Sequence, residues 1–121
     1  MHAPPDHSDD AEARRDRIRS EIIVDAYNPE EQALGWYYYL ESKLPFPFEA
    51  RCIRERPVSP LHEGETVRVT GLPDEKNCMD EVFVTIDWDD RTLGVPLSQL
   101  EGIDVDAKTQ QAIADWRYWN G

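Results

Sequence analysis

Four consecutive aromatic residues, at positions 36 to 39, follow a strong helix start and constrain the fold more than any other feature. Asn28 is a good N-cap, Pro29 suits the first helical position, and Glu31 can complete a capping box. Successive residues of a helix point about 100° apart, so four adjacent rings cover most of its circumference. The segment therefore predicts a helix that packs against neighbours on more than one side.

This aromatic helix should end at Lys43 or Leu44, because Pro45 and Pro47 bias the residues before them toward extended backbone. Its larger apolar residues divide between two faces, with Ala33, Trp36, Tyr37, Leu40 and Leu44 on one and Leu34 and Tyr38 on the other. We interpret the aromatic run as mainly structural, with buried rings and with tyrosine hydroxyls at a wet edge. A ligand-stacking surface is the alternative interpretation.

Two further helices are expected around the aromatic one. A charged helix is predicted from about Ala11 to Ala26, with an apolar stripe of isoleucines at 18, 22 and 23. Asp106 is expected to N-cap a last helix. The apolar stripe of that helix consists of Ala112, Ile113, Trp116 and Trp119.

After Pro47 the pattern changes to short alternating segments, which favour strands at 48–54, 66–70, 82–88, 92–96 and 102–105. A tight Asp89-Asp90 hairpin turn joins the third and fourth of these, and one helical turn spans 97–100. This order is typical of SH3-like barrels. The predicted fold class is therefore α+β, a small SH3-like five-stranded β-barrel with two N-terminal helices and one C-terminal helix packed on it.

The chain length of 121 residues favours one compact unit. We expect residues 1–10 to form a disordered acidic and proline-containing tail and residues 11–45 a helical subdomain. Residues 46–105 would form the barrel, and 106–121 a C-terminal helix that packs on the helical subdomain. We expect this unit to be a monomer.

The charge of the chain excludes several classes of partner. There are 25 Asp plus Glu residues against 13 Lys plus Arg, a formal net charge of −12, which argues against nucleic acid. The sequence has no apolar run of the length that a signal peptide or a membrane span needs, so we expect a cytoplasmic protein. Cys52 and Cys78 lack CxxC spacing and are expected to be free thiols.

No catalytic motif is present in the sequence. HExxH, GxSxG and phosphate-cradling glycine loops are missing, and the only histidine outside the tail, His62, sits alone in a loop that contains several prolines. The sequence therefore predicts a protein that is not an enzyme.

Carboxylates are the one chemical group that gathers repeatedly in the sequence. Like charges about 4 to 6 Å apart raise each other's pKa and destabilise the compact state, and a divalent cation relieves this cost. An oxygen-only donor set favours Ca²⁺ over Zn²⁺. An EF-hand is excluded, since a loop that starts at Asp87 has Thr92 where glycine is needed.

Any calcium site must then combine separated segments, and two acidic patches are expected at opposite poles of the barrel. Asp87, Asp89, Asp90 and Asp104 would form the first with Glu49, and Glu41 would join them from the aromatic helix. Asp74, Glu75 and Asp80 would form the second beside Glu63. The predicted calcium ligands are Glu41, Asp74, Glu75, Asp80, Asp87, Asp89, Asp90 and Asp104.

Long segments of the chain resemble the family of cyanobacterial calcium-binding proteins typified by CcbP. The resemblance rests on EIIVDAYNPEEQALGWYYYLESKLPFPFEARCI, GETVRVTGL, VPLSQLEGID and DWRYWN, and it extends from about Glu21 to Asn120. It implies a small acidic protein with helices packed on a β-barrel, which binds Ca²⁺ without EF-hands and acts as an intracellular buffer or sensor. A regulatory protein partner is left open.

Three other interpretations remain open on the sequence alone. Each acidic patch can be a solvated charged face without a fixed ion. The barrel can be a protein-interaction module without metal, presenting Trp88 or Tyr118 to a proline-rich peptide. The acidic surface can also mimic nucleic-acid charge toward a basic partner.

Overall fold

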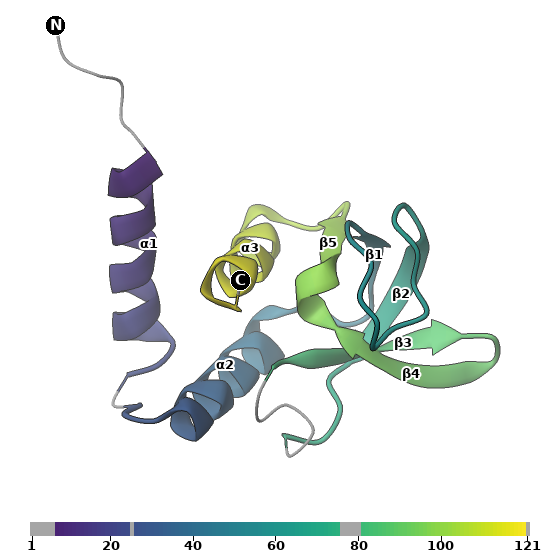
Figure 1. Ribbon diagram of the computed structural model, residues 1–121, viewed down its shortest axis with the longest axis horizontal. Helices are drawn as coiled ribbons and strands as arrows, with labels where there is room; N and C mark the ends of the chain where they lie inside the picture. Colours follow the sequence, from purple (N-terminus) through teal and green to yellow (C-terminus); the bar gives the residue numbers. More distant parts are fainter. Residues whose placement is uncertain (1–6, 25, 76–80, 121) are drawn as a thin grey trace, which may run out of the picture.

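The computed structural model describes residues 7–24, 26–75 and 81–120. Its elements follow the order α1 (His7–Glu21), α2 (Pro29–Lys43), β1 (Phe48–Cys52), β2 (Thr66–Gly71), β3 (Phe83–Trp88), β4 (Arg91–Pro96), η2 (Leu97–Gln99), β5 (Leu100–Ile103) and α3 (Ala107–Asn120). Figure 1 shows the three helices on one side of the molecule and the sheet on the other. The α+β class and the count of two N-terminal helices, five strands and one C-terminal helix are confirmed for the described residues.

The five strands form one antiparallel sheet in the order β4-β3-β2-β1-β5. Alternate residues of β1 and β2 are buried, as expected for strands with one face on a core. The pairings among the described residues do not join β4 to β5. The predicted five-stranded sheet is thus confirmed, whereas its closure into a barrel is not shown.

The aromatic helix α2 begins and ends where the sequence predicts. The Asn28 side chain accepts a hydrogen bond from the Glu31 backbone N–H at 2.8 Å, and it donates one to the Glu31 carboxylate at 2.7 Å. At the other end, the Leu44 N–H still bonds to the Leu40 carbonyl while Leu44 itself is extended. Local contacts therefore define both ends of α2.

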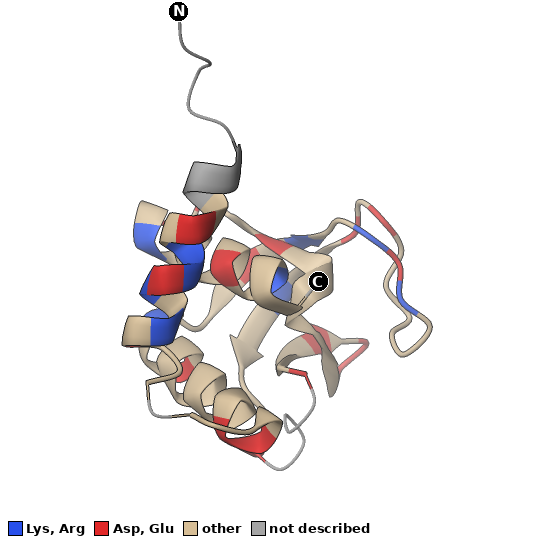
Figure 2. Cartoon of the chain, turned by 60° about the vertical axis from the view of Figure 1, so that its left-hand side comes forward, with Lys and Arg blue, Asp and Glu red and all other residues tan. Residues whose placement is uncertain are grey.

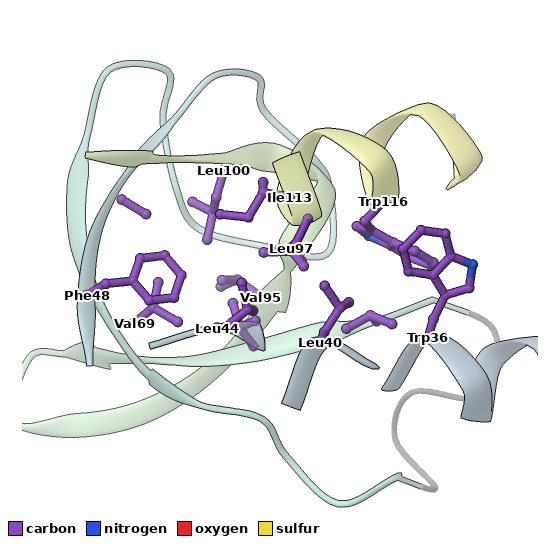
Figure 3. Packing of buried hydrophobic residues seen from close by; sticks show 14 of the residues in the cluster. Trp36, Leu40, Leu44, Phe48, Val69, Val95, Leu97, Leu100, Ile113 and Trp116 are labelled. Carbon is purple, nitrogen blue, oxygen red and sulfur yellow. The ribbon is translucent and has the colours of Figure 1, made fainter. Parts of the chain in front are cut away.

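The aromatic residues of α2 do pack on more than one side. Trp36 is only 1% exposed and contacts Trp116 of α3 edge to face, with ring centroids 5.1 Å apart (Figure 3). The neighbouring Tyr37 is also buried, and its hydroxyl donates to the Pro73 carbonyl at 2.6 Å. Tyr38, by contrast, points outward and is half exposed. The interpretation of the run as mainly structural therefore holds for Trp36 and Tyr37.

Helix α1 is attached to α3 by a buried ion pair. Asp115 is fully buried and accepts two short hydrogen bonds from Arg17, at 2.6 and 2.7 Å, and its Oδ1 lies 3.1 Å from Nε of Arg14. A buried carboxylate without such partners would be strongly destabilising. The two arginines thus attach the charged helix α1 to α3.

Several boundaries differ from the sequence-based expectation. Helix α1 begins at His7 rather than near Ala11, so residues 7–10 of the predicted tail are helical, and β1 ends at Cys52 rather than at 54. Two other differences have a clear local cause. Helix α1 ends at Glu21 rather than near Ala26, because Ile22 and Ile23 leave the helix and are buried against α2. The last strand spans 100–103 rather than 102–105, because Asp104 has a φ of +53°, which a strand residue does not adopt. The predicted N-cap of α3 is confirmed, since Asp106 accepts from the Thr109 N–H at 2.7 Å.

A polar cluster joins the long loop after β1 to η2 and the end of α3. Glu81 receives hydrogen bonds from Arg56, Ser98 and Asn120. Burial raises the pKa of Glu81, but the hydrogen bonds from these three residues and the charge of Arg56 outweigh this, so its pKa lies below the ordinary value of 4.5. The cluster holds the segment before β3 to three other segments that are distant in sequence.

We predict that Glu81→Gln lowers the free energy of unfolding by about 1–3 kcal/mol at neutral pH, because a partly buried, charged hydrogen-bond network is broken. A lowered folded-state pKa stabilises the fold above pH 4.5, and this contribution is lost as the pH falls through the folded value. Urea unfolding from neutral to acidic pH should show the difference between wild type and variant shrinking below that pH. A difference that stays constant would contradict the role given to Glu81.

We also predict that Gly35→Ala destabilises the protein. A Cβ at this position would lie 2.8 Å from the Ile22 carbonyl oxygen, which is backbone and cannot move aside alone. Alanine gains about 1 kcal/mol of helix propensity, but overpacking costs about 1–3 kcal/mol, and the clash should prevail. Chemical denaturation measures the net loss. Gly94→Ala is the control, because its Cβ would meet only Phe83 at 4.0 Å.

Candidate metal site

The acidic residues of this chain divide into two groups, and the first is held by internal partners. Glu81 pairs with Arg56, Asp115 with Arg14 and Arg17, and Glu101 with Arg51. Asp106 belongs here as well, since hydrogen bonds from Thr109 lower its pKa while it caps α3. These carboxylates have structural roles and offer few free lone pairs to an ion.

The second group contains most of the predicted calcium ligands. Within the described part of the chain, no ion pair involves Glu41, Asp74, Glu75, Asp87, Asp89, Asp90 or Asp104. Asp80 lies outside the described residues. Figure 2 shows the main run of basic residues on α1, while acidic residues also occur on α2, α3 and the loops. The second group therefore has no ion-pair partner among the described basic residues, although Arg91 lies near the three aspartates of the hairpin.

Three predicted ligands line one surface hollow, which we call the tyrosine hollow. It has a volume of about 300 Å³ and is lined by Tyr37, Tyr38, Glu41, Asp74 and Glu75. Residues 37, 38 and 41 lie within one turn of α2, and residues 74 and 75 belong to the loop after β2. Among the described residues, no basic side chain lines it. The hollow thus brings together three carboxylates from two separate segments.

Hydrogen bonds from two tyrosines hold the loop against α2. The Tyr37 hydroxyl donates to the Pro73 carbonyl, and the Tyr38 hydroxyl donates to the carboxylate of Glu75. The bond to Glu75 is the main reason why the pKa of Tyr38 is raised, with burial next. These contacts place Asp74 and Glu75 beside Glu41. Glu75 keeps further lone pairs, because a carboxylate has about four acceptor positions.

The β3–β4 hairpin forms a second, separate hollow of about 450 Å³ that includes Asp87, Asp89 and Asp90. Asp89 and Asp90 have φ values of +46° and +62°, as both central residues of a type I′ turn require. The predicted hairpin turn is thus confirmed. Unlike the tyrosine hollow, this one also contains Arg91, whose charge offsets part of the negative potential.

The grouping of the acidic residues differs from the sequence-based expectation. Glu41 was expected beside the hairpin, but it lies in the tyrosine hollow with Asp74 and Glu75, because α2 packs on the loop after β2. Asp104 follows β5, whose Ile103 pairs with Glu49 of β1. Strand β5 occupies the opposite edge of the sheet from the hairpin strand β4.

The donor chemistry fits a hard divalent cation, although the side chains are not gathered around one point. Within residues 7–24, 26–75 and 81–120, no three His, Cys, Asp or Glu side chains are close enough together to hold one ion. Every acidic group of the tyrosine hollow offers oxygen, the ligand that Ca²⁺ prefers, and Ca²⁺ completes its shell readily with carbonyls and water. The residues therefore fit Ca²⁺ in chemistry, and binding requires them to draw together.

Sequence reasoning did not name Tyr37 and Tyr38 as residues of a calcium site, because it interpreted the aromatic run as mainly structural. A signal was available. Glu41 follows Tyr38 by three residues and Tyr37 by four, which places all three on one side of a helix.

Comparison with known proteins agrees with this chemistry. A family model described as calcium binding, that of CcbP, matches residues 16–120. The crystal structure of Anabaena CcbP is similar, with 40% sequence identity and a TM-score of 0.77, over 98% of this chain and 94% of that one. A calcium-binding protein in its calcium-binding form has 43% identity and a TM-score of 0.78, over 89% of each chain.

Two negative findings accompany these matches. Comparison with curated proteins gave no match. In the described part of the chain, no helix has the length and apolar character that crossing a bilayer would require.

The family model matches residues 16–120, which is most of the chain. The two solved structures support the match, because they are 40% and 43% identical to this chain and cover 98% and 89% of it. The chain therefore belongs to the CcbP family of calcium-binding proteins.

Proposed function

We propose that this protein is a monomeric, non-enzymatic calcium buffer or sensor of the cytoplasm, with its principal calcium site in the tyrosine hollow. Glu41, Asp74 and Glu75 are the proposed ligands, and Asp80 is a further one from the segment that follows. The observation that carries this proposal is that three carboxylates from two segments line one hollow, which no basic residue of the described ranges lines.

Charge is the reason why this hollow favours an ion. Carboxylates that face one another without a counter-ion raise the free energy of the folded state, and a bound dication removes that cost. Asp115 and Glu81 receive a compensating positive charge from arginine. No arginine of the described residues lines the hollow, so a bound Ca²⁺ would supply the positive charge and the carboxylate oxygens would coordinate it.

The hairpin is proposed as a second and weaker site, formed by Asp87, Asp89 and Asp90. Its carboxylates come from one short turn and share their hollow with Arg91. Asp104 lies after β5 and is proposed as a peripheral ligand only. Both sites use exposed side chains, so dissociation constants on the order of 10⁻⁶ to 10⁻⁴ M are expected.

Calcium binding at the tyrosine hollow would also change contacts within the protein, as a sensor requires. An ion that takes up Glu75 competes with the Tyr38 hydroxyl for the same carboxylate. The neighbouring Tyr37 hydroxyl holds the loop at Pro73, and Trp36 lies next to it in the core. A movement of the loop toward Glu41 would therefore change the contacts of α2.

A cytoplasmic location is supported by Cys52, a buried free thiol, which suits a reducing compartment.

We predict that the triple variant Glu41→Gln, Asp74→Asn, Glu75→Gln raises the main calcium dissociation constant by at least about tenfold, because ligand charge count sets affinity. Calorimetric titration of chelator-stripped protein with CaCl₂ measures the change. Asp89→Asn with Asp90→Asn should alter the main constant by less than about threefold.

Glu30→Gln is the matched control, since Glu30 is an exposed glutamate on the same helix that lies away from the hollow. It should leave calcium binding unchanged. If the triple variant kept its calcium affinity and the hairpin variant lost most of its affinity, the principal site would have to be the β3–β4 turn.

We further predict that calcium affinity falls as salt concentration rises and persists in excess Mg²⁺. The Debye length is about 8 Å at physiological ionic strength, so exposed carboxylates are screened measurably. Mg²⁺ demands a rigid octahedral shell, which loosely placed side chains do not provide. Repeating the titration at two salt concentrations, with and without Mg²⁺, tests both points. A calcium affinity that does not change with salt concentration would instead indicate a buried site.

A further inference from the structure

Tyr37 and Tyr38 are neighbours in sequence, but their hydroxyl groups hold the loop after β2 in two different ways. Tyr37 is 8% exposed, and its hydroxyl donates a hydrogen bond of 2.6 Å to the backbone carbonyl of Pro73. Tyr38 is 53% exposed, and its hydroxyl donates to the carboxylate of Glu75. One hydroxyl therefore binds the backbone of the loop, and the other binds a proposed calcium ligand.

The Tyr37 hydrogen bond restricts where the ligands of the loop can lie. The carbonyl that it holds belongs to the peptide group between Pro73 and Asp74, and Glu75 is the next residue. Ordering a loop on binding costs conformational entropy and so lowers affinity. Because Tyr37 already restricts this peptide group, calcium binding has less of the loop to order. The bond uses no carboxylate oxygen, so it leaves the ligands themselves free.

The Tyr38 hydrogen bond acts on a ligand directly. It is made to Oε2 of Glu75, and Ca²⁺ often takes both oxygens of a glutamate. Among the described residues, no three acidic side chains are close enough together to hold one ion, so binding requires those of the hollow to draw together. A Glu75 carboxylate that turns toward an ion shared with Glu41 and Asp74 has to give up the Tyr38 hydroxyl. The free energy of that hydrogen bond is then lost from the free energy of calcium binding.

We propose that these two hydroxyls set the calcium affinity of the tyrosine hollow in opposite directions. Tyr37 is a positioning residue that strengthens binding, and Tyr38 is an internal competitor that weakens it. This inference rests on the calcium site proposed for the hollow. The combination keeps the loop beside α2 while leaving calcium easy to release, as a reversible buffer or sensor requires.

The test is a calorimetric titration with CaCl₂ of full-length, chelator-stripped variants that each lack one hydroxyl. Tyr38→Phe should lower the calcium dissociation constant by about threefold, because the competing hydrogen bond is removed. Tyr37→Phe should raise it by about threefold, because the loop is no longer held. Tyr39→Phe is the matched control, since Tyr39 lies on the same helix but does not line the hollow, and it should have no effect.

An NMR measurement follows the Tyr38 hydrogen bond itself. The protein has five tyrosines, and labelling each with ¹³C at Cζ gives a signal that responds to the hydrogen bonding of its hydroxyl. The signals of Tyr37 and Tyr38 are those missing from the corresponding phenylalanine variants. On addition of CaCl₂, the Tyr38 signal should move toward that of Tyr27, which is 84% exposed, and the Tyr37 signal should move less. A tyrosine with only a structural role would keep its signal in place.

The outcomes separate this inference from the proposed site. If the triple variant of Glu41, Asp74 and Glu75 loses affinity, the site stands. The inference is nevertheless overturned if Tyr38→Phe fails to bind calcium more tightly, or if both phenylalanine variants shift the dissociation constant in the same direction. If neither the triple variant nor the two phenylalanine variants change the dissociation constant, the proposed site and the inference are both wrong.

Discussion

Charge balance is the constraint on which the rest of this structure depends. With 25 acidic residues against 13 basic ones, the fold cannot give every carboxylate a cation. Arg14 and Arg17 pair with buried Asp115, and Arg56 pairs with partly buried Glu81, where an unpaired carboxylate would be costly. Arg51 pairs with Glu101 nearer the surface. The proposed calcium ligands among the described residues are exposed.

Helix α2 connects this charge distribution to the core. On one side it buries Trp36 against Trp116, which joins the helices to each other. On the other side Tyr37 holds the loop after β2, and Glu41 lines one hollow with Asp74 and Glu75. One helix therefore carries both the aromatic core contact and one wall of the acidic hollow. This arrangement suits an ion that accepts irregular coordination, as Ca²⁺ does.

Much of the fold could be predicted from the sequence where the signals are local. The Asn28 cap, the prolines after Lys43, the Asp89-Asp90 turn and the Asp106 cap each act within a few residues, and each appears as expected. The errors arose where distant contacts decide. Ile22 leaves α1 because it packs against α2, a contact that no periodicity reveals.

The candidate site was predictable in its chemistry but not in its arrangement. An excess of oxygen donors without His or Cys clusters pointed to calcium, and the family match confirms that assignment. The grouping of the carboxylates depends on how α2 packs against the rest of the fold. The sequence-based prediction placed Glu41 beside the β3–β4 hairpin, whereas it lines a hollow with the loop after β2. The sequence-based prediction did not include Tyr38 in the site, because the aromatic run was interpreted as mainly structural. Its hydroxyl donates a hydrogen bond to Glu75.

The most direct measurement of the principal site is an anomalous-difference map from crystals of the chelator-stripped protein soaked in CaCl₂. A bound Ca²⁺ should give its strongest peak between α2 and the loop after β2, about 2.3–2.6 Å from oxygens of Glu41, Asp74 or Glu75. A strongest peak at Asp89 and Asp90, with none beside Tyr37 and Tyr38, would contradict the assignment.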